Sequence, residues 1–338
     1  MNVAQSGGKT ILLVGPSFLQ LNIAKLLHEK GHFPMIVAPQ VQLDNFKKYL
    51  YNNTVPEDER PLCNDDQLTI GLPDLPLEPE LLGGNNVIDG VIFTAEEALI
   101  TPAALKAVLS FEGFGEKGPR RAICVLPIKE FVNKEKSMSW IPIMNNDKKE
   151  AEVWKAFERG WDEYAYSRKR SPTTVRVGSL LGGSVDGPEA LKTTGLNECI
   201  SKMSLEQYRD MKELAFDRHR NGVQLIQGDG INVKPEGQKK LEEKNLKGEA
   251  LEEFRISNGY PEQDRSNRHS VAYAVVETYF RENAGELNVG DMEGKCLKEF
   301  TILATASALP TKTKEWDALF AQPGPAAWPD PETFVKQE

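Results

Sequence analysis

The chain has 338 residues, of which 40% are apolar, 27% charged and 8% aromatic, and its formal net charge is −9. This length and composition are typical of a folded protein with a sizeable core, and no apolar run approaches the ~20 residues of a membrane-spanning helix. The negative charge repels phosphate backbones at long range, so we expect no nucleic-acid partner and, at a membrane, only peripheral association.

The four cysteines, Cys63, Cys124, Cys199 and Cys296, are far apart and form no C-x-x-C pair. This spacing opposes both a zinc site and a disulfide framework. The four histidines also lack metal-ligand spacing, so we predict no metal. The N-terminus does not have the pattern of a secretory signal peptide, and removal of an organelle transit peptide would leave the same sequence. These features fit a reducing compartment inside the cell.

The first forty residues have the pattern of a β-strand, an α-helix and a second β-strand. Residues 10–14 are Thr-Ile-Leu-Leu-Val, a short β-rich run typical of a strand buried on both faces of a parallel sheet. After Gly15, Pro16 and Ser17, apolar residues recur at helical spacing through Leu27, and Gly31 supplies a helix stop. Residues 34–38 form a second apolar run, which completes a segment of the length of a βαβ unit.

The same alternation of strands and helices continues along the chain. We predict a helix over 41–50, a strand over 68–71, strands over 91–94 and 121–126, helices over 102–109 and 148–168, and a strand over 173–177. Strands that alternate with helices predict an α/β fold with a doubly wound parallel sheet of the Rossmann type. In such a sheet, ligands bind at the carboxyl ends of the strands.

The alternation fades after about residue 185, which suggests a division of the chain. We assign residues 9–184 to a Rossmann-type domain and 185–320 to a smaller C-terminal α/β region that completes the fold. In the second region we predict a charged, solvent-facing helix inserted near 234–255, a helix over 271–280 and a last strand over 299–303. Residues 321–338 are rich in proline, so we expect an extended surface tail.

Several short segments, taken in order and spacing, resemble the atypical short-chain dehydrogenases of the NmrA-like type. These segments are the first βαβ unit, residues 89–95, Lys148 with Glu152 four residues later, and residues 174–178. The last segment is similar to the T-x-x-R-P-G strand end of that family, with Val177 in the place of proline. The resemblance covers residues 9–181 and, more faintly, 265–320. The family has an NAD(P)-binding Rossmann fold and includes plastid and cyanobacterial proteins that act in assembly or redox sensing.

The resemblance implies a cofactor site with degenerate motifs. In the family's G-x-x-G-x-x-G loop, absent side chains let backbone N–H groups approach a pyrophosphate. Here Gly15 is retained, whereas Phe18 and Leu21 replace the other two glycines. Gln40 follows the second strand, where relatives carry an acid or an arginine, so no preference between NAD and NADP is predicted. The cofactor contacts implied by the resemblance are Gly15, Ser17, Phe18, Leu19, Gln40, Thr94, Ala95 and Lys148.

The catalytic residues that the resemblance implies are also incomplete. Relatives carry a serine at the end of the fifth strand and a Tyr-x-x-x-Lys pair that activates the substrate oxygen. When Lys148 is aligned with that lysine, Met144 takes the position of the tyrosine, and Leu126 with Pro127 takes that of the serine. Lys148 is therefore the one retained catalytic candidate.

Two hypotheses for function follow. The first is a non-catalytic protein on an NAD(P)-binding fold, a subunit, assembly factor or regulator of a larger complex, with protein partners and with either no cofactor or weakly bound NADP(H). Its expected location is the plastid stroma, with the cytoplasm as the alternative. The second is an active NAD(P)H-dependent reductase of the atypical short-chain dehydrogenase type. An open cleft above Phe18 would favour the enzyme, and a filled one the non-catalytic protein.

Overall fold

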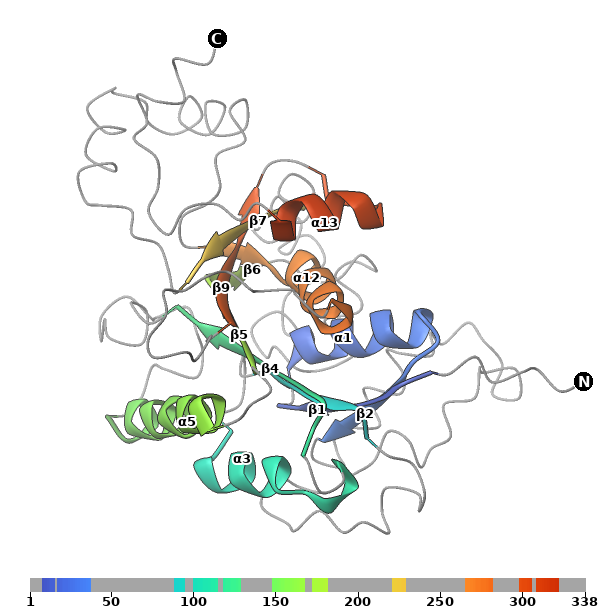
Figure 1. Ribbon diagram of the computed structural model, residues 1–338. Helices are drawn as coiled ribbons and strands as arrows, with labels where there is room; N and C mark the ends of the chain where they lie inside the picture. The colour runs from blue at the N-terminus through green and yellow to red at the C-terminus, as the bar shows by residue number, and fades with distance from the viewer. Residues whose placement is uncertain are drawn as a thin grey trace, which may run out of the picture.

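A mostly parallel sheet forms the centre of the computed structural model (Figure 1). The structure describes residues 8–15, 17–37, 88–94, 100–114, 118–128, 148–167, 172–181, 221–228, 265–281, 298–305 and 308–321. In sheet order, its strands in these ranges are β2 (Phe33–Val37), β1 (Thr10–Val14), β3 (Gly90–Thr94), β4 (Arg121–Pro127), β5 (Thr173–Val177), β9 (Lys298–Thr305) and β7 (Gly222–Gln227). β7 runs antiparallel to β9, and the other neighbours pair in parallel.

Helices cover both faces of this sheet. α1 (Phe18–Glu29) and α12 (Arg268–Phe280) lie together on one face, whereas α3 (Pro102–Leu109) and α5 (Lys148–Ser167) pack together on the other (Figure 1). The short strands β6 (Ser179–Leu181) and β8 (Arg265–Asn267) pair in parallel beside the main sheet, η3 (Glu112–Phe114) is a 3-10 turn, and α13 (Thr313–Ala321) lies next to β7. The predicted Rossmann-type α/β fold is confirmed, with an antiparallel edge strand added to it.

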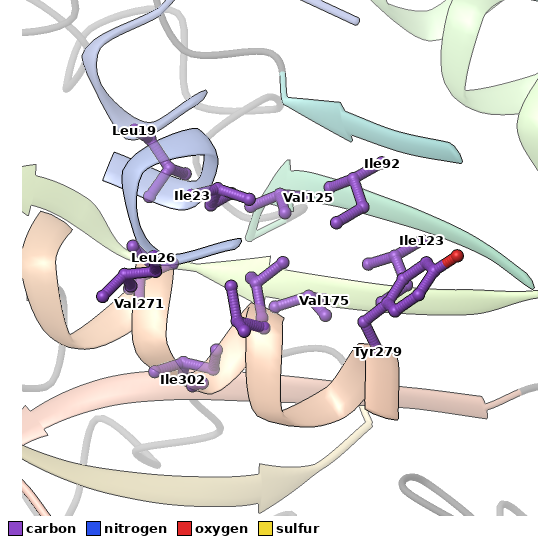
Figure 2. Packing of buried hydrophobic residues seen from close by; sticks show 14 of the residues in the cluster. Leu19, Ile23, Leu26, Ile92, Ile123, Val125, Val175, Val271, Tyr279 and Ile302 are labelled. Atoms are coloured by element: carbon purple, nitrogen blue, oxygen red, sulfur yellow. The ribbon is translucent and has the colours of Figure 1, made fainter. Parts of the chain in front are cut away.

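β1 to β5 bury both of their faces, as their apolar runs predict. In β1, Ile11 and Leu13 belong to the core under α1 and α12, and Leu12 and Val14 belong to the core under α3 and α5. This division follows from the alternation of side chains along a strand. Figure 2 shows the first core, in which side chains of α1 and α12 meet those of β3, β4, β5 and β9. The first core, to which α1 contributes six side chains, holds this helix against the sheet after β1.

Both ends of α1 are fixed by local hydrogen bonds. Ser17 has extended backbone angles, and its side chain accepts a hydrogen bond from the Gln20 backbone N–H, as an N-cap residue does. At the other end, Gly31 has a φ of +80°, its N–H donates to the His28 carbonyl at 2.9 Å, and the His32 N–H donates to the Leu27 carbonyl at 2.9 Å. This pair of bonds is a Schellman motif, so the predicted helix stop at Gly31 is confirmed.

The largest differences from the sequence prediction concern the C-terminal half, whereas β2, β3, β4 and α5 differ from their predicted bounds by a single residue. The helix predicted over 271–280 begins earlier, at Arg268, because Asn267 caps it, and the last strand extends over Lys298–Thr305. β6, β7, β8 and α13 were not predicted, and α13 includes residue 321, which we had assigned to the tail. The elements predicted over 41–50, 68–71 and 234–255, and residues 322–338 of the tail, lie outside the described residues.

Cys124 in β4 provides a test of the predicted core. It is a free cysteine with no exposed surface, and burial raises the pKa of its thiol. Since the thiolate is the reactive form, we expect iodoacetamide to modify Cys124 in the folded protein at least ~100-fold more slowly than in urea, measured by mass spectrometry of its tryptic peptide. Rapid modification in the native state would contradict its position in the core. The other three cysteines lie outside the described residues, so the absence of disulfides among them stays a prediction.

Candidate functional site

The carboxyl ends of β1 and β3 form the point at which the order of the sheet reverses. β1 is followed through α1 by β2 on one side, and β3 lies on the other side. Open α/β sheets bind ligands at such a switch point. The residues at this place are Gly15 and Ser17, which follow β1, and Thr94, which ends β3. Three of the predicted cofactor contacts are thus brought together here.

Gly15 makes the tight turn that the sequence predicts. Its φ is +108°, a backbone conformation that favours glycine. A Cβ built on Gly15 would lie 1.8 Å from the carbonyl oxygen of Thr94, so the backbone of the loop runs directly against the end of β3. No residue with a side chain fits at this position without moving one of the two segments.

Hydroxyl groups connect the loop to β3. The Thr94 hydroxyl donates to the Gly15 carbonyl at 3.0 Å, and the Ser17 hydroxyl donates to Thr94 Oγ1 at 3.3 Å. Ser17 Oγ in turn accepts the Gln20 backbone N–H at 3.0 Å. Ser17 and Thr94 have no exposed surface. One N–H of the first turn of α1, a group that would face a phosphate in a dinucleotide site, is therefore bonded within the protein.

The side chains that follow in α1 are buried. Leu19 is 1% exposed and Leu21 has no exposed surface, and both belong to the core under α1 and α12. Figure 2 shows Leu19 in this core with Ile23. The predicted cofactor contact at Leu19 is thus limited to its backbone. Residues 15–24 contain no ionisable side chain, so this segment offers no basic group to a pyrophosphate.

Gln20 is a feature that the sequence analysis missed. Its side chain has no exposed surface, and neither Nε2 nor Oε1 has a hydrogen-bond partner. Gln20 lies three residues after the N-cap Ser17, the spacing of a capping box, in which the side chain at this position accepts the N–H of the cap residue. The Ser-x-x-Gln spacing of residues 17–20 could have identified Gln20 from the sequence.

The carboxyl end of β4, where relatives are expected to carry a catalytic serine, has different chemistry. Leu126 is fully buried in the core under α3 and α5. The carbonyl of Pro127 accepts a hydrogen bond from Arg176 Nη1 at 3.0 Å. Ile128 is 2% exposed and packs with Ile226 and Leu303. These three consecutive residues of β4 and its end provide neither a hydroxyl group nor an ionisable side chain.

Arg176, from the strand end that is similar to the T-x-x-R-P-G motif, lies in a buried ion network. Its side chain has no exposed surface, and its Nη2 is 2.5 Å from Glu158 Oε1 in α5, while its Nε is 2.8 Å from Glu299 Oε1 in β9. With the bond to Pro127, the guanidinium joins α5, β4, β5 and β9. Its position indicates a structural role rather than contact with a ligand.

The other predicted site residues fall outside what the structure describes. Gln40 and Ala95 are not in the described ranges, nor is Met144. Phe18 and Lys148 are the first residues of α1 and α5, and their side chains are not described. The predicted roles of these four cofactor contacts, and the question of a cleft above Phe18, stay predictions.

Comparison with known proteins identifies no family for the chain, and the similar solved structures share little sequence identity with it. No family model matches the chain, and no curated protein matches it. Similar solved structures include a predicted NADH-flavin reductase from Streptococcus pneumoniae, with 11% identity, a TM-score of 0.37 and coverage of 88% of this chain and 100% of that one. A predicted epimerase from Bacteroides thetaiotaomicron has 12% identity, a TM-score of 0.41 and coverage of 90% and 99%. The yeast methylglyoxal/isovaleraldehyde reductase in complex with NADPH has 15% identity, a TM-score of 0.33 and coverage of 51% and 58%.

The class of the protein therefore follows from its own topology. A sheet of order β2-β1-β3-β4-β5-β9-β7, with helices on both faces and a glycine turn at the switch point, is a Rossmann-like α/β fold, the kind on which NAD(P) is bound. None of the helices in the described ranges is long and apolar enough to cross a membrane. Within those ranges, no group of three or more His, Cys, Asp or Glu side chains is arranged to hold a metal ion.

Proposed function

We propose that this chain is a non-catalytic protein with a Rossmann-like fold that acts as a subunit, assembly factor or regulator of a larger complex. The observation that carries the proposal is the end of β4, where Leu126 and Ile128 are buried and the Pro127 carbonyl is bonded to Arg176. Proton transfer to or from a substrate needs a titratable or hydroxyl group beside the reacting atom. The plastid stroma as its compartment rests on the family resemblance alone.

The loop after β1 supports the same conclusion. Two of the three glycines of the family's loop are replaced, by Phe18 and Leu21, and Leu21 is a fully buried core residue. Ser17 and Thr94 bond to each other and to the backbone of this loop. The sequence thus keeps the residues that build the fold, Gly15 among them, and lacks two of the glycines that let backbone N–H groups approach a pyrophosphate.

We expect the protein to show no saturable binding of NADPH or NADH below about millimolar concentration, measured by isothermal titration calorimetry. A micromolar affinity corresponds to about −8 kcal/mol, and each charge-assisted hydrogen bond lost at the pyrophosphate removes roughly 1.5–3 kcal/mol of it. A millimolar affinity is about 4 kcal/mol weaker, so the loss of two or three such bonds brings binding into that range. A dissociation constant in the low micromolar range would contradict the proposal.

The variant Phe18→Gly tests whether the missing glycines are the cause. It restores the second glycine of the loop, so NADPH binding should become measurable without turnover, because Met144 still replaces the tyrosine. Leu21→Gly is unsuitable, since it removes a fully buried core side chain and is expected to cost 2 kcal/mol or more, an order-of-magnitude figure for large-to-small core changes. Phe18→Leu, which keeps a large apolar side chain, serves as the matched control and should leave binding undetectable.

The partner is tested by purification of the tagged chain from its native source, followed by native mass spectrometry. A partner present in stoichiometric amount, and retained through a second column, is the expected result. The recombinant chain mixed with that purified partner should then form the same complex. A chain that purifies alone from its native source would contradict the proposed role.

A second candidate is an active NAD(P)H-dependent reductase. The observation that favours it is Gly15, whose φ of +108° at the switch point is the tight turn of a dinucleotide site. It predicts NADPH oxidation in the presence of a carbonyl or flavin substrate, and it predicts loss of this activity in Lys148→Met. Turnover by the unmodified protein would establish this candidate in place of the non-catalytic role.

A further inference from the structure

The side chain of Gln20 is both buried and unpaired. It has no exposed surface, and its amide donor Nε2 and acceptor Oε1 both lack a hydrogen-bond partner. The great majority of buried polar side-chain atoms in proteins have a partner, because an unpaired one loses its bonds to water and gains nothing in return. Asn22, which is 3% exposed on the same helix, does have an interaction partner. Gln20 therefore needs an explanation.

The direction of the side chain follows from its position in the helix. Side chains of an α-helix lean toward its amino end, so we expect the Gln20 carboxamide to lie toward the first turn of α1, on the side of Ser17. A capping box would use Oε1 to accept the N–H of Ser17, and this bond is not formed. Both polar atoms of the carboxamide therefore remain available to a group bound near the amino end of α1.

The chemistry around Gln20 selects a neutral group. Residues 15–24 contain no ionisable side chain, and the Gln20 backbone N–H is already donated to Ser17 Oγ. An anion would therefore find neither a basic side chain in this segment nor that helix donor. The Gln20 carboxamide has an N–H donor next to a carbonyl acceptor. A ligand that satisfies both needs an acceptor and a donor side by side.

We propose that Gln20 is the recognition residue of a buried site at the amino end of α1, and that its ligand is a neutral molecule with an amide-like edge. A primary carboxamide and a nucleobase both have such an edge, with a donor next to an acceptor. The ligand would make two hydrogen bonds with Gln20 and would satisfy both of its unpaired atoms. This inference does not depend on the non-catalytic role proposed above.

The first test compares the stability of variants of the full chain without added ligand. Gln20→Met removes the unpaired carboxamide and keeps the length of the side chain, so its melting temperature should rise by about 2 °C. Gln20→Leu is a second variant of the same kind and should also be at least as stable as the unmodified protein. Asn22→Leu, a nearly isosteric change at a buried polar residue that has a partner, is the matched control and should lower the melting temperature. Equal destabilisation by all three variants overturns the proposal.

The second test measures binding by ligand-observed saturation-transfer NMR at millimolar concentration. Nicotinamide is the carboxamide probe, adenosine the nucleobase probe, and nicotinic acid the negative control, because its carboxylate lacks the donor and carries charge. We expect at least one of the first two to bind, with a dissociation constant about ten-fold or more weaker in Gln20→Met, and nicotinic acid not to bind. The probe that binds identifies the source of the amide-like edge.

Binding of neither nicotinamide nor adenosine to the unmodified protein overturns the proposal, even if Gln20→Met is more stable. Equal binding to the unmodified protein and Gln20→Met also overturns it, because the probe then occupies another place. None of the probes contains a pyrophosphate, so these results are independent of the NADPH titration. Turnover of NADPH would contradict the proposed non-catalytic role. It would not bear on Gln20, whose role the probe binding and the Gln20 variants test.

Discussion

Replacement of Arg176 by methionine is expected to destabilise the protein by about 3–5 kcal/mol, the cost of removing one partner from a buried ion pair. The guanidinium has no exposed surface, and the Glu158 and Glu299 side chains are only 11% and 17% exposed. Without Arg176, the Glu158 and Glu299 carboxylates would remain largely buried, and each would lose this charged partner. Urea unfolding monitored by tryptophan fluorescence measures the change.

Two further variants separate the loss of the ion pair from the loss of packing. Arg176→Met combined with Glu158→Gln and Glu299→Gln removes the uncompensated charges, so it should recover a large part of the lost stability. Asp317→Asn breaks a pair with Arg281 in which the aspartate is 58% exposed, and it should cost less than about 1 kcal/mol. If Arg176→Met costs no more than Asp317→Asn, the network does not hold the strands together.

The strand and helix pattern could be predicted where local signals are strong. β1, α1 and β2 follow from two apolar runs, the helical spacing of apolar residues between them and the stop at Gly31, all within about thirty residues. By contrast, β7 is six residues long and joins the sheet through β9, which lies more than seventy residues further along the chain. β6 and β8 are three residues long and, among the strands that the structure describes, pair with each other alone. Such short strands are defined by their distant partners, which a single sequence does not reveal.

The sequence also predicted only part of the candidate site, because contacts between distant residues leave no local pattern. Gly15, Ser17 and Thr94 could be placed at one end of the sheet, because parallel strands bring their carboxyl ends to one edge. The hydroxyl bond between Ser17 and Thr94 joins residues 77 positions apart, and no local sequence pattern indicates it. The ion pairs of Arg176 reach Glu158 and Glu299, 18 and 123 residues away. The sequence identified Arg176 only as part of a strand-end motif.

Gly15→Ala is expected to destabilise the protein by about 2–6 kcal/mol, because two costs of about 1–3 kcal/mol each add together. The first is conformational, since a φ of +108° is a region that residues with a side chain rarely adopt. The second is steric, since the new Cβ would lie 1.8 Å from the Thr94 carbonyl oxygen and 2.9 Å from its carbonyl carbon. Both atoms belong to the backbone of β3, which is held by hydrogen bonds to β1 and β4 and cannot move aside cheaply.

Gly31→Ala is the matched control, and it isolates the steric cost. Gly31 also has a positive φ, of +80°, but a Cβ at this position would meet no atom within 4 Å. This variant should therefore lose only about 1 kcal/mol of conformational free energy, as expected for a glycine at a helix C′ position. The difference between the two variants in urea unfolding measures how tightly the loop after β1 is pressed against β3. Similar losses for Gly15→Ala and Gly31→Ala would mean that the loop can withdraw from β3, and that the switch point is more open than the bonds of Ser17 and Thr94 indicate.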